Sequence, residues 1–156
     1  MSAERSDFLE ALITHEAAVG RLYQVFAEVF PTRERFWRAL AAEEQGHADR
    51  LGVLGSDPTI NGWLLRESGL RLQVVRSSIG YIESQMERAR EGRLNLLQAL
   101  SIARDLENAL IEDQFSRMSG SPHVAATPIL TRLAGETDGH RRMLAEAIEA
   151  ERRALS

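Results

Sequence analysis

Residues 40–51 read LAAEEQGHADRL, and residues 133–144 repeat much of that pattern as LAGETDGHRRML. The two segments share Leu, Ala, Glu, Gly, His and Leu at matching positions. A further glutamate precedes each histidine, by 31 residues for Glu16 and His47 and by 33 residues for Glu107 and His140. We therefore interpret the chain as two helix pairs, each of which supplies one glutamate and then one histidine-bearing segment.

Around these segments, apolar residues recur at steps of three and four over four long stretches, which predicts four amphipathic helices. We expect these helices at about 6–30, 33–54, 94–118 and 129–155. Thr32 is expected to cap the second helix. The connection 55–93 contains the break GSDPTING and a shorter amphipathic helix over 77–92 that ends at Gly92. The pattern predicts one all-α domain over residues 1–156, a four-helix bundle whose long crossover between helices 2 and 3 carries an accessory helix.

The composition limits the chemistry that the chain can support. The 156 residues include no cysteine and no lysine, so all 19 basic residues are arginine. This excludes disulfides, thiolate catalysis, Cys-built metal sites, lysine Schiff bases and P-loops. A net charge of −4 argues against a nucleic-acid-binding protein, which usually carries a basic stripe. We recognise no signal peptide and no apolar run of membrane-spanning length, so we expect a soluble cytoplasmic protein.

Ionisable residues lie within the apolar stripes of all four expected helices. On the first helix, Glu16 stands between Leu12 and Val19 at the spacing that keeps all three on one face. At 100° per residue, the ionisable positions of the other helices also point to the apolar side. The residues that point inward in this way are Glu16, Glu44, His47, Glu107 and His140.

A divalent metal ion is the simplest compensation for these buried charges. Ionised carboxylates are costly to bury, and the stripes contain no lysine or arginine to pair with them. Glu44 and His47 are three residues apart and can bind one ion, and carboxylate with imidazole ligands suits iron, manganese or zinc. Glu136, four residues before His140, points about 40° away from that histidine. With Glu136, four carboxylates would balance two divalent ions; without it, three carboxylates match one ion or a water-bridged pair.

The sequence resembles the rubrerythrin-type branch of the ferritin-like superfamily over nearly its whole length. The resemblance includes ERAREGRLNLLQALSIARDLENALIEDQF at residues 87–115. It implies a site for two iron ions that takes Glu from helix 1, Glu-x-x-His from helix 2, Glu from helix 3 and Glu-x-x-His from helix 4. By position these residues are Glu16, Glu44, His47, Glu107 and His140, with Thr137 in place of the last glutamate.

Other positions follow or depart from the family pattern. Tyr23 matches an aromatic residue that lies near the metals in such proteins. Leu110 replaces an additional glutamate of rubrerythrin, and Phe115 stands where a tyrosine is often found. The Cys-rich electron-transfer domain of the family is not in this sequence, so a catalytic protein would need an external electron donor. The resemblance also implies a homodimer, for which the crossover with Trp63 is a candidate surface.

Three functions are compatible with the sequence. The first is oxidation of Fe(II) coupled to reduction of O2 or peroxide at a di-iron site. The second is metal binding for structure or sequestration without turnover, which Thr137 and Leu110 favour. The third is a metal-free helical oligomer, which leaves the buried charges uncompensated. Two further histidines are not expected to be ligands, because His15 should point to solvent and His123 lies in a proline-containing loop.

Overall fold

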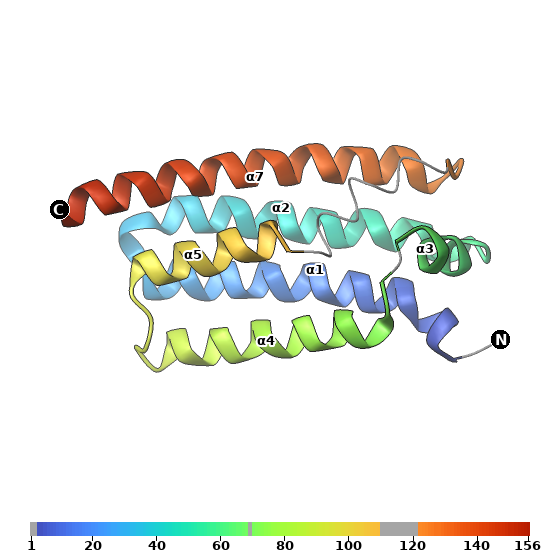
Figure 1. The fold of residues 1–156 in the computed structure, drawn as a ribbon, viewed down its shortest axis with the longest axis horizontal. Helices are drawn as coiled ribbons and strands as arrows, with labels where there is room; N and C mark the ends of the chain where they lie inside the picture. The colour runs from blue at the N-terminus through green and yellow to red at the C-terminus, as the bar shows by residue number, and fades with distance from the viewer. Residues whose placement is uncertain (1–2, 69, 110–121) are drawn as a thin grey trace.

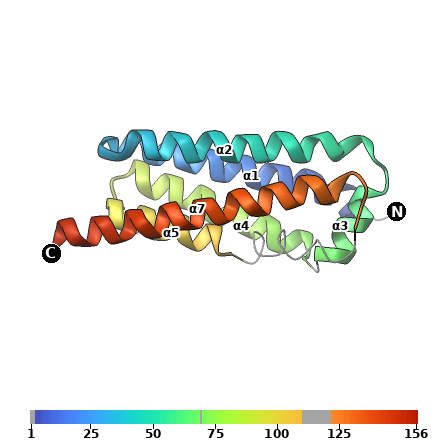
Figure 2. The ribbon, with the colours of Figure 1, turned by 90° about the horizontal axis from the view of Figure 1, so that it is seen from above.

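The protein is all-helical in the computed structural model, which describes residues 3–68, 70–109 and 122–156. The long helices run along the longest dimension of the molecule (Figures 1 and 2). They are α1 (Ala3–Val29), α2 (Glu34–Gly52), α4 (Leu72–Arg90) and α7 (Ala126–Leu155). The shorter elements are α3 (Ile60–Ser68), α5 (Leu96–Glu107) and the 3₁₀ turns Pro31–Arg33 and Val53–Ser56. The all-α prediction is confirmed, since no strand occurs in the described ranges.

Helix α1 lies at the centre of the packing. It packs most extensively against α2 and α4 and also contacts α3, whereas α7 packs against α5 and α2. Figure 1 shows α2 and α4 on opposite sides of α1, with α7 beyond α2. Helix α4 corresponds to the accessory helix expected at 77–92, but it begins earlier, at Leu72, and it packs along α1. No helix in the described ranges is both long and apolar enough to cross a membrane.

Local sequence signals account for the reversal between α4 and α5. Gly92 adopts a positive φ of 72°, and its N–H donates to the carbonyl of Ala89. Glycine accepts this left-handed conformation without a steric penalty, so the predicted helix end at Gly92 is confirmed. Asn95 then caps α5, because its side chain accepts a hydrogen bond from the backbone N–H of Gln98 while the Gln98 side chain accepts one from the Asn95 N–H.

Three expected helix boundaries were wrong. Thr32 lies inside the 3₁₀ turn that follows Phe30, and α2 begins at Glu34 without a side-chain cap; such turns are common at helix N-termini. Helix α3 occupies part of the expected break over 55–62. Helix α5 ends at Glu107, where the N–H of Asn108 bonds to the Arg104 carbonyl, so the expected helix over 94–118 is not continuous. Leu110, Phe115 and Met118 lie outside the described residues.

The core consists of two apolar clusters with buried polar residues between them. On α1, for example, Leu12 belongs to one cluster and Val19 to the other, and Glu16 lies between them. On α2 and α7 as well, buried polar residues lie between residues of one cluster and residues of the other. We call the intervening residues the polar layer; each is at most 2% exposed, and they are His15, Glu16, Glu44, His47, Glu107, Thr137 and His140.

Candidate metal centre

Four helices bring five of the six predicted ligands together in the polar layer. Helix α1 supplies Glu16, α2 supplies Glu44 and His47, α5 supplies Glu107 at its last residue, and α7 supplies His140. Each of the five is 1% exposed. Their carboxylate oxygens and imidazole nitrogens fall into two groups of three, and within each group these atoms all lie within 4.8 Å of one another. Donor atoms bound to one metal ion at about 2.1 Å are separated by roughly 3–4 Å, so each group is close to the size of a coordination shell.

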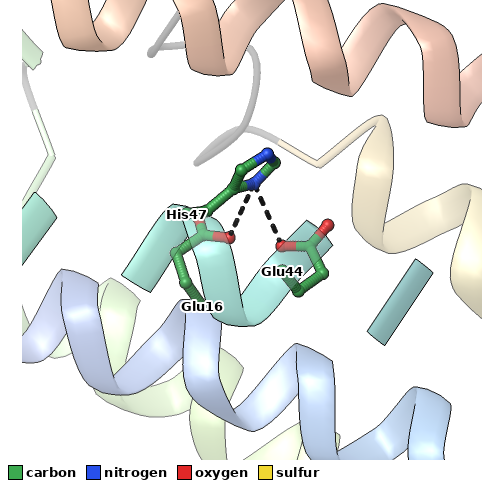
Figure 3. A group of neighbouring side chains, drawn as sticks. All are labelled: Glu16, Glu44 and His47. Atoms are coloured by element: carbon green, nitrogen blue, oxygen red, sulfur yellow. Dashed lines mark ion pairs between the residues drawn. The ribbon is translucent and has the colours of Figure 1, made fainter. Parts of the chain in front are cut away.

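The first half-site consists of Glu16, Glu44 and His47 (Figure 3). The Nδ1 atom of His47 lies 3.4 Å from Oε2 of Glu44 and 3.8 Å from Oε2 of Glu16. The two glutamates come from neighbouring helices and direct their carboxylates toward the same nitrogen (Figure 3). An ion between these three groups would bind one imidazole and two carboxylates, a ligand set that suits iron, manganese or zinc.

The second half-site consists of Glu44, Glu107 and His140. The Nδ1 atom of His140 lies 3.2 Å from Oε1 of Glu44 and 3.3 Å from Oε1 of Glu107. Glu107 Oε1 also accepts a hydrogen bond of 2.9 Å from the hydroxyl of Tyr23. The other oxygen of Glu107 is buried and has no hydrogen-bond partner among the described residues. A buried carboxylate oxygen of this kind is costly unless a cation or a proton satisfies it.

Glu44 joins the two half-sites. Its Oε2 atom faces His47 and its Oε1 atom faces His140, so one carboxylate directs one oxygen into each group. The two imidazole rings stack with their centroids 5.7 Å apart and their planes inclined by 19°. If each group held an ion, Glu44 would be a ligand of both.

In the metal-free protein, the close approach of charged groups in the second half-site shifts their pKa values. Burial alone would lower the pKa of His140, but hydrogen bonds and charges from Glu107 and Glu44 raise it to about 11. Burial alone would raise the pKa of Glu107, but contacts with His140, Glu44 and Tyr23 hold it below its ordinary value. A positive charge is therefore favoured between these carboxylates, and a metal ion would supply it in place of the proton.

Glu136, the sixth predicted ligand, lies outside both groups. Its Oε2 atom is 2.7 Å from Nε2 of His47, on the opposite side of that ring from the first half-site, and also accepts a 2.7 Å hydrogen bond from Arg50. Burial opposes ionisation, but the contacts with His47 and Arg50 lower the pKa of Glu136. Thr137, at the position of the family's last glutamate, is 2% exposed and belongs to the polar layer.

A seventh residue, Glu43, was not predicted from the sequence, because it lies at the edge of the apolar stripe of α2. Its side chain is 51% exposed, yet its Oε2 atom makes a short contact with Nε2 of His140. The signal for Glu43 is present in the two repeated segments. When His47 is aligned with His140, Glu43 aligns with Glu136 and Glu44 aligns with Thr137.

The two remaining histidines, His15 and His123, lie in different surroundings. His15 was predicted to be exposed, and this is wrong: it is 1% exposed, and its Nε2 atom lies 2.8 Å from the Ser78 hydroxyl of α4. Burial lowers the pKa of His15 to about 4, against an opposing effect of Glu107. His123 belongs to neither half-site. Its Nδ1 atom accepts hydrogen bonds from the N–H groups of Ala125 and Ala126, so it caps the start of α7.

Comparisons of this chain with protein-family models, with curated proteins and with solved structures found no match. The functional interpretation therefore depends on the geometry and chemistry of the polar layer.

Proposed function

We propose that this protein is a non-haem di-metal carboxylate protein with two adjacent ions, iron in the first instance and manganese or zinc as alternatives. The observation that carries the proposal is the pair of buried half-sites that share the Glu44 carboxylate. We further propose that α1, α2, α5 and α7 are the four helices of a ferritin-like bundle. Helices α3 and α4 then form the crossover, and the homodimer implied by the family resemblance remains part of the proposal.

The five predicted ligands in the polar layer then have defined tasks. Glu16 and His47 hold one ion, Glu107 and His140 hold the other, and Glu44 binds both. The Tyr23 hydroxyl keeps one oxygen of Glu107 oriented by a hydrogen bond. The apolar clusters on both sides of the layer keep bulk water from the carboxylates, which strengthens their attraction for cations.

The proposed reaction is oxidation of Fe(II) coupled to reduction of O2 or peroxide. When bound, two iron ions would supply two electrons, enough to convert one hydrogen peroxide and two protons into two water molecules. Stopped-flow mixing of anaerobic Fe(II)-loaded protein with peroxide tests this reaction. We expect one peroxide consumed per two Fe(II), together with an absorption band of ferric iron. Absence of both would contradict the redox function.

Metal binding without turnover is the second candidate, and Thr137 favours it. A buried threonine replaces the carboxylate that the repeat would place opposite Glu44, so the centre has three inward carboxylates rather than four. In that case the protein should retain a transition metal through aerobic purification while peroxide is not consumed. A protein that retains no transition metal at neutral pH would contradict both candidates.

A further inference from the structure

Glu43 and Glu136 make matching contacts at the outer sides of the two candidate histidine ligands. Glu43 of α2 contacts Nε2 of His140 on α7, and Glu136 of α7 contacts Nε2 of His47 on α2. Each of the two helices therefore supplies one histidine and also supplies the carboxylate that holds the other helix's histidine. The exchange follows the repeated segments, in which the two glutamates occupy equivalent positions.

These contacts fix which nitrogen of each ring faces the half-sites. A carboxylate accepts a hydrogen bond but cannot donate one, so each Nε2 atom must carry its proton. In a neutral imidazole the lone pair is then on Nδ1, the atom that faces Glu44 in both half-sites. Outer carboxylates that orient a metal-binding histidine in this way also raise its basicity as a ligand.

We propose that Glu43 and Glu136 are positioning residues that hold the two histidines with Nδ1 directed at the metal ions. This inference rests on the proposed di-metal function. It adds two residues that do not touch the ions, and it explains why the α2 and α7 segments repeat a glutamate that is not in either half-site. The two helices are thereby locked to each other in the register that completes both half-sites.

A simple surface role would not produce this arrangement. Glu34, on the same helix as Glu43, has the same side-chain exposure of 51% and pairs with the exposed Arg38 one turn away. Glu43 instead reaches a ring that is 1% exposed and lies on a helix 97 residues further along the chain. Glu34 is therefore a matched control for the loss of one exposed glutamate from α2.

Zn(II) titration with a competing chelator measures the predicted effect. We expect Glu43→Ala and Glu136→Ala each to weaken the binding of one Zn(II) by about 10- to 100-fold. The Gln variants, which still accept a hydrogen bond but lack the charge, should show a smaller loss, and Glu34→Ala should bind Zn(II) like the wild type. Melting curves of the metal-free variants establish that they remain folded.

Imidazole nitrogen NMR of the Zn(II)-loaded protein adds a readout that a structural role would not change. Glu43→Ala should shift the Nε2–H signal of His140 and leave that of His47 near its wild-type position, and Glu136→Ala should do the reverse. If wild type binds two Zn(II) and the Ala variants match it in affinity and in these signals, the positioning roles are wrong but the metal site stands. If wild type binds no Zn(II), Fe(II) or Mn(II), the proposed function itself fails.

Discussion

The first and second half-sites each combine a histidine Nδ1 atom, one oxygen of Glu44 and a glutamate from another helix, α1 in the first and α5 in the second. Their surroundings differ more than their ligands. In the first half-site the outer carboxylate, Glu136, also contacts Arg50 and Arg132. In the second half-site the outer carboxylate is Glu43, which contacts His140 and no arginine among the described residues, and a tyrosine hydroxyl donates to the inner glutamate, Glu107.

This difference in surroundings indicates that the donor atoms decide whether an ion can bind at each half-site, whereas the neighbouring charges decide how tightly it binds. The donor atoms are equivalent, so both positions should accept the same kinds of ion. Arg50 and Arg132 place positive charge beside the outer carboxylate of the first half-site, and this charge opposes a cation there. Arg141, near the second half-site, donates to the backbone carbonyl of Glu107 and pairs with Asp138, which offsets part of its charge. We therefore expect sequential loading, with the first equivalent of metal entering the second half-site.

Loss of Glu44 should have the largest effect, because it is the ligand common to both positions. Glu44→Gln should lower the affinity for both ions by more than about 100-fold, whereas Glu16→Gln and Glu107→Gln should each lose one ion. Metal content after dialysis against buffered Zn(II) measures the stoichiometry. A Glu44→Gln protein that retains two ions would show that the half-sites are independent of the shared carboxylate.

Thr137→Glu should make the centre more symmetric, since the repeat aligns Thr137 with Glu44. We expect the second equivalent of Zn(II) to bind about tenfold more tightly, because a fourth inward carboxylate is added. The metal-free variant should melt at a lower temperature than wild type, because burying another charge is costly. Unchanged stoichiometry and affinity would contradict the account of Thr137 as a missing ligand.

Arg50→Gln should reduce the difference between the half-sites. Removal of a charge close to Glu136 should strengthen binding of the second equivalent of Zn(II) by about three- to tenfold and leave the first equivalent unchanged. Arg38 lies on the same helix and pairs with the exposed Glu34, so Arg38→Gln is the control for a general change in charge. Equal strengthening in both variants would mean that Arg50 acts only through net charge.

The inward-pointing residues could be predicted from sequence because each belongs to a regular stripe on one helix. Glu16 and His140 occupy positions that helical periodicity assigns to the core, whatever the partner helix is. The outer roles of Glu43 and Glu136 could not be obtained in this way. Both lie at the edge of their stripes, and their contacts depend on how α2 and α7 are placed against each other.

The wrong predictions for His15 and for the end of α5 also arose because a stripe on one helix does not show what packs against it or where the helix ends. His15 departs by one residue from the stripe of α1, and it is buried because α4 covers that face of the helix. The periodic pattern also continues past Glu107, whereas the structure ends the helix there. Asparagine at position 108 competes for backbone hydrogen bonds and favours helix ends, a weaker signal than a stripe of apolar residues.

Ser78→Ala should have the smallest effect and should separate His15 from the other two histidines of the polar layer. His47 and His140 each have a carboxylate at Nε2, whereas His15 has the Ser78 hydroxyl there. Loss of this half-buried partner should lower the free energy of unfolding by about 1 kcal/mol at pH 7.5. Ser77→Ala, at an exposed position of the same helix, should change it by less than about 0.5 kcal/mol.

Urea unfolding with and without Zn(II) then tests whether His15 belongs to the metal centre. If it serves stability alone, Ser78→Ala should cost the same free energy in both states, and its Zn(II) stoichiometry should equal that of wild type. A larger loss in the presence of Zn(II) would link His15 to the neighbouring Glu16 and hence to the first half-site. The polar layer would then contain three functional histidines, and α4 would support the first half-site through Ser78 and His15.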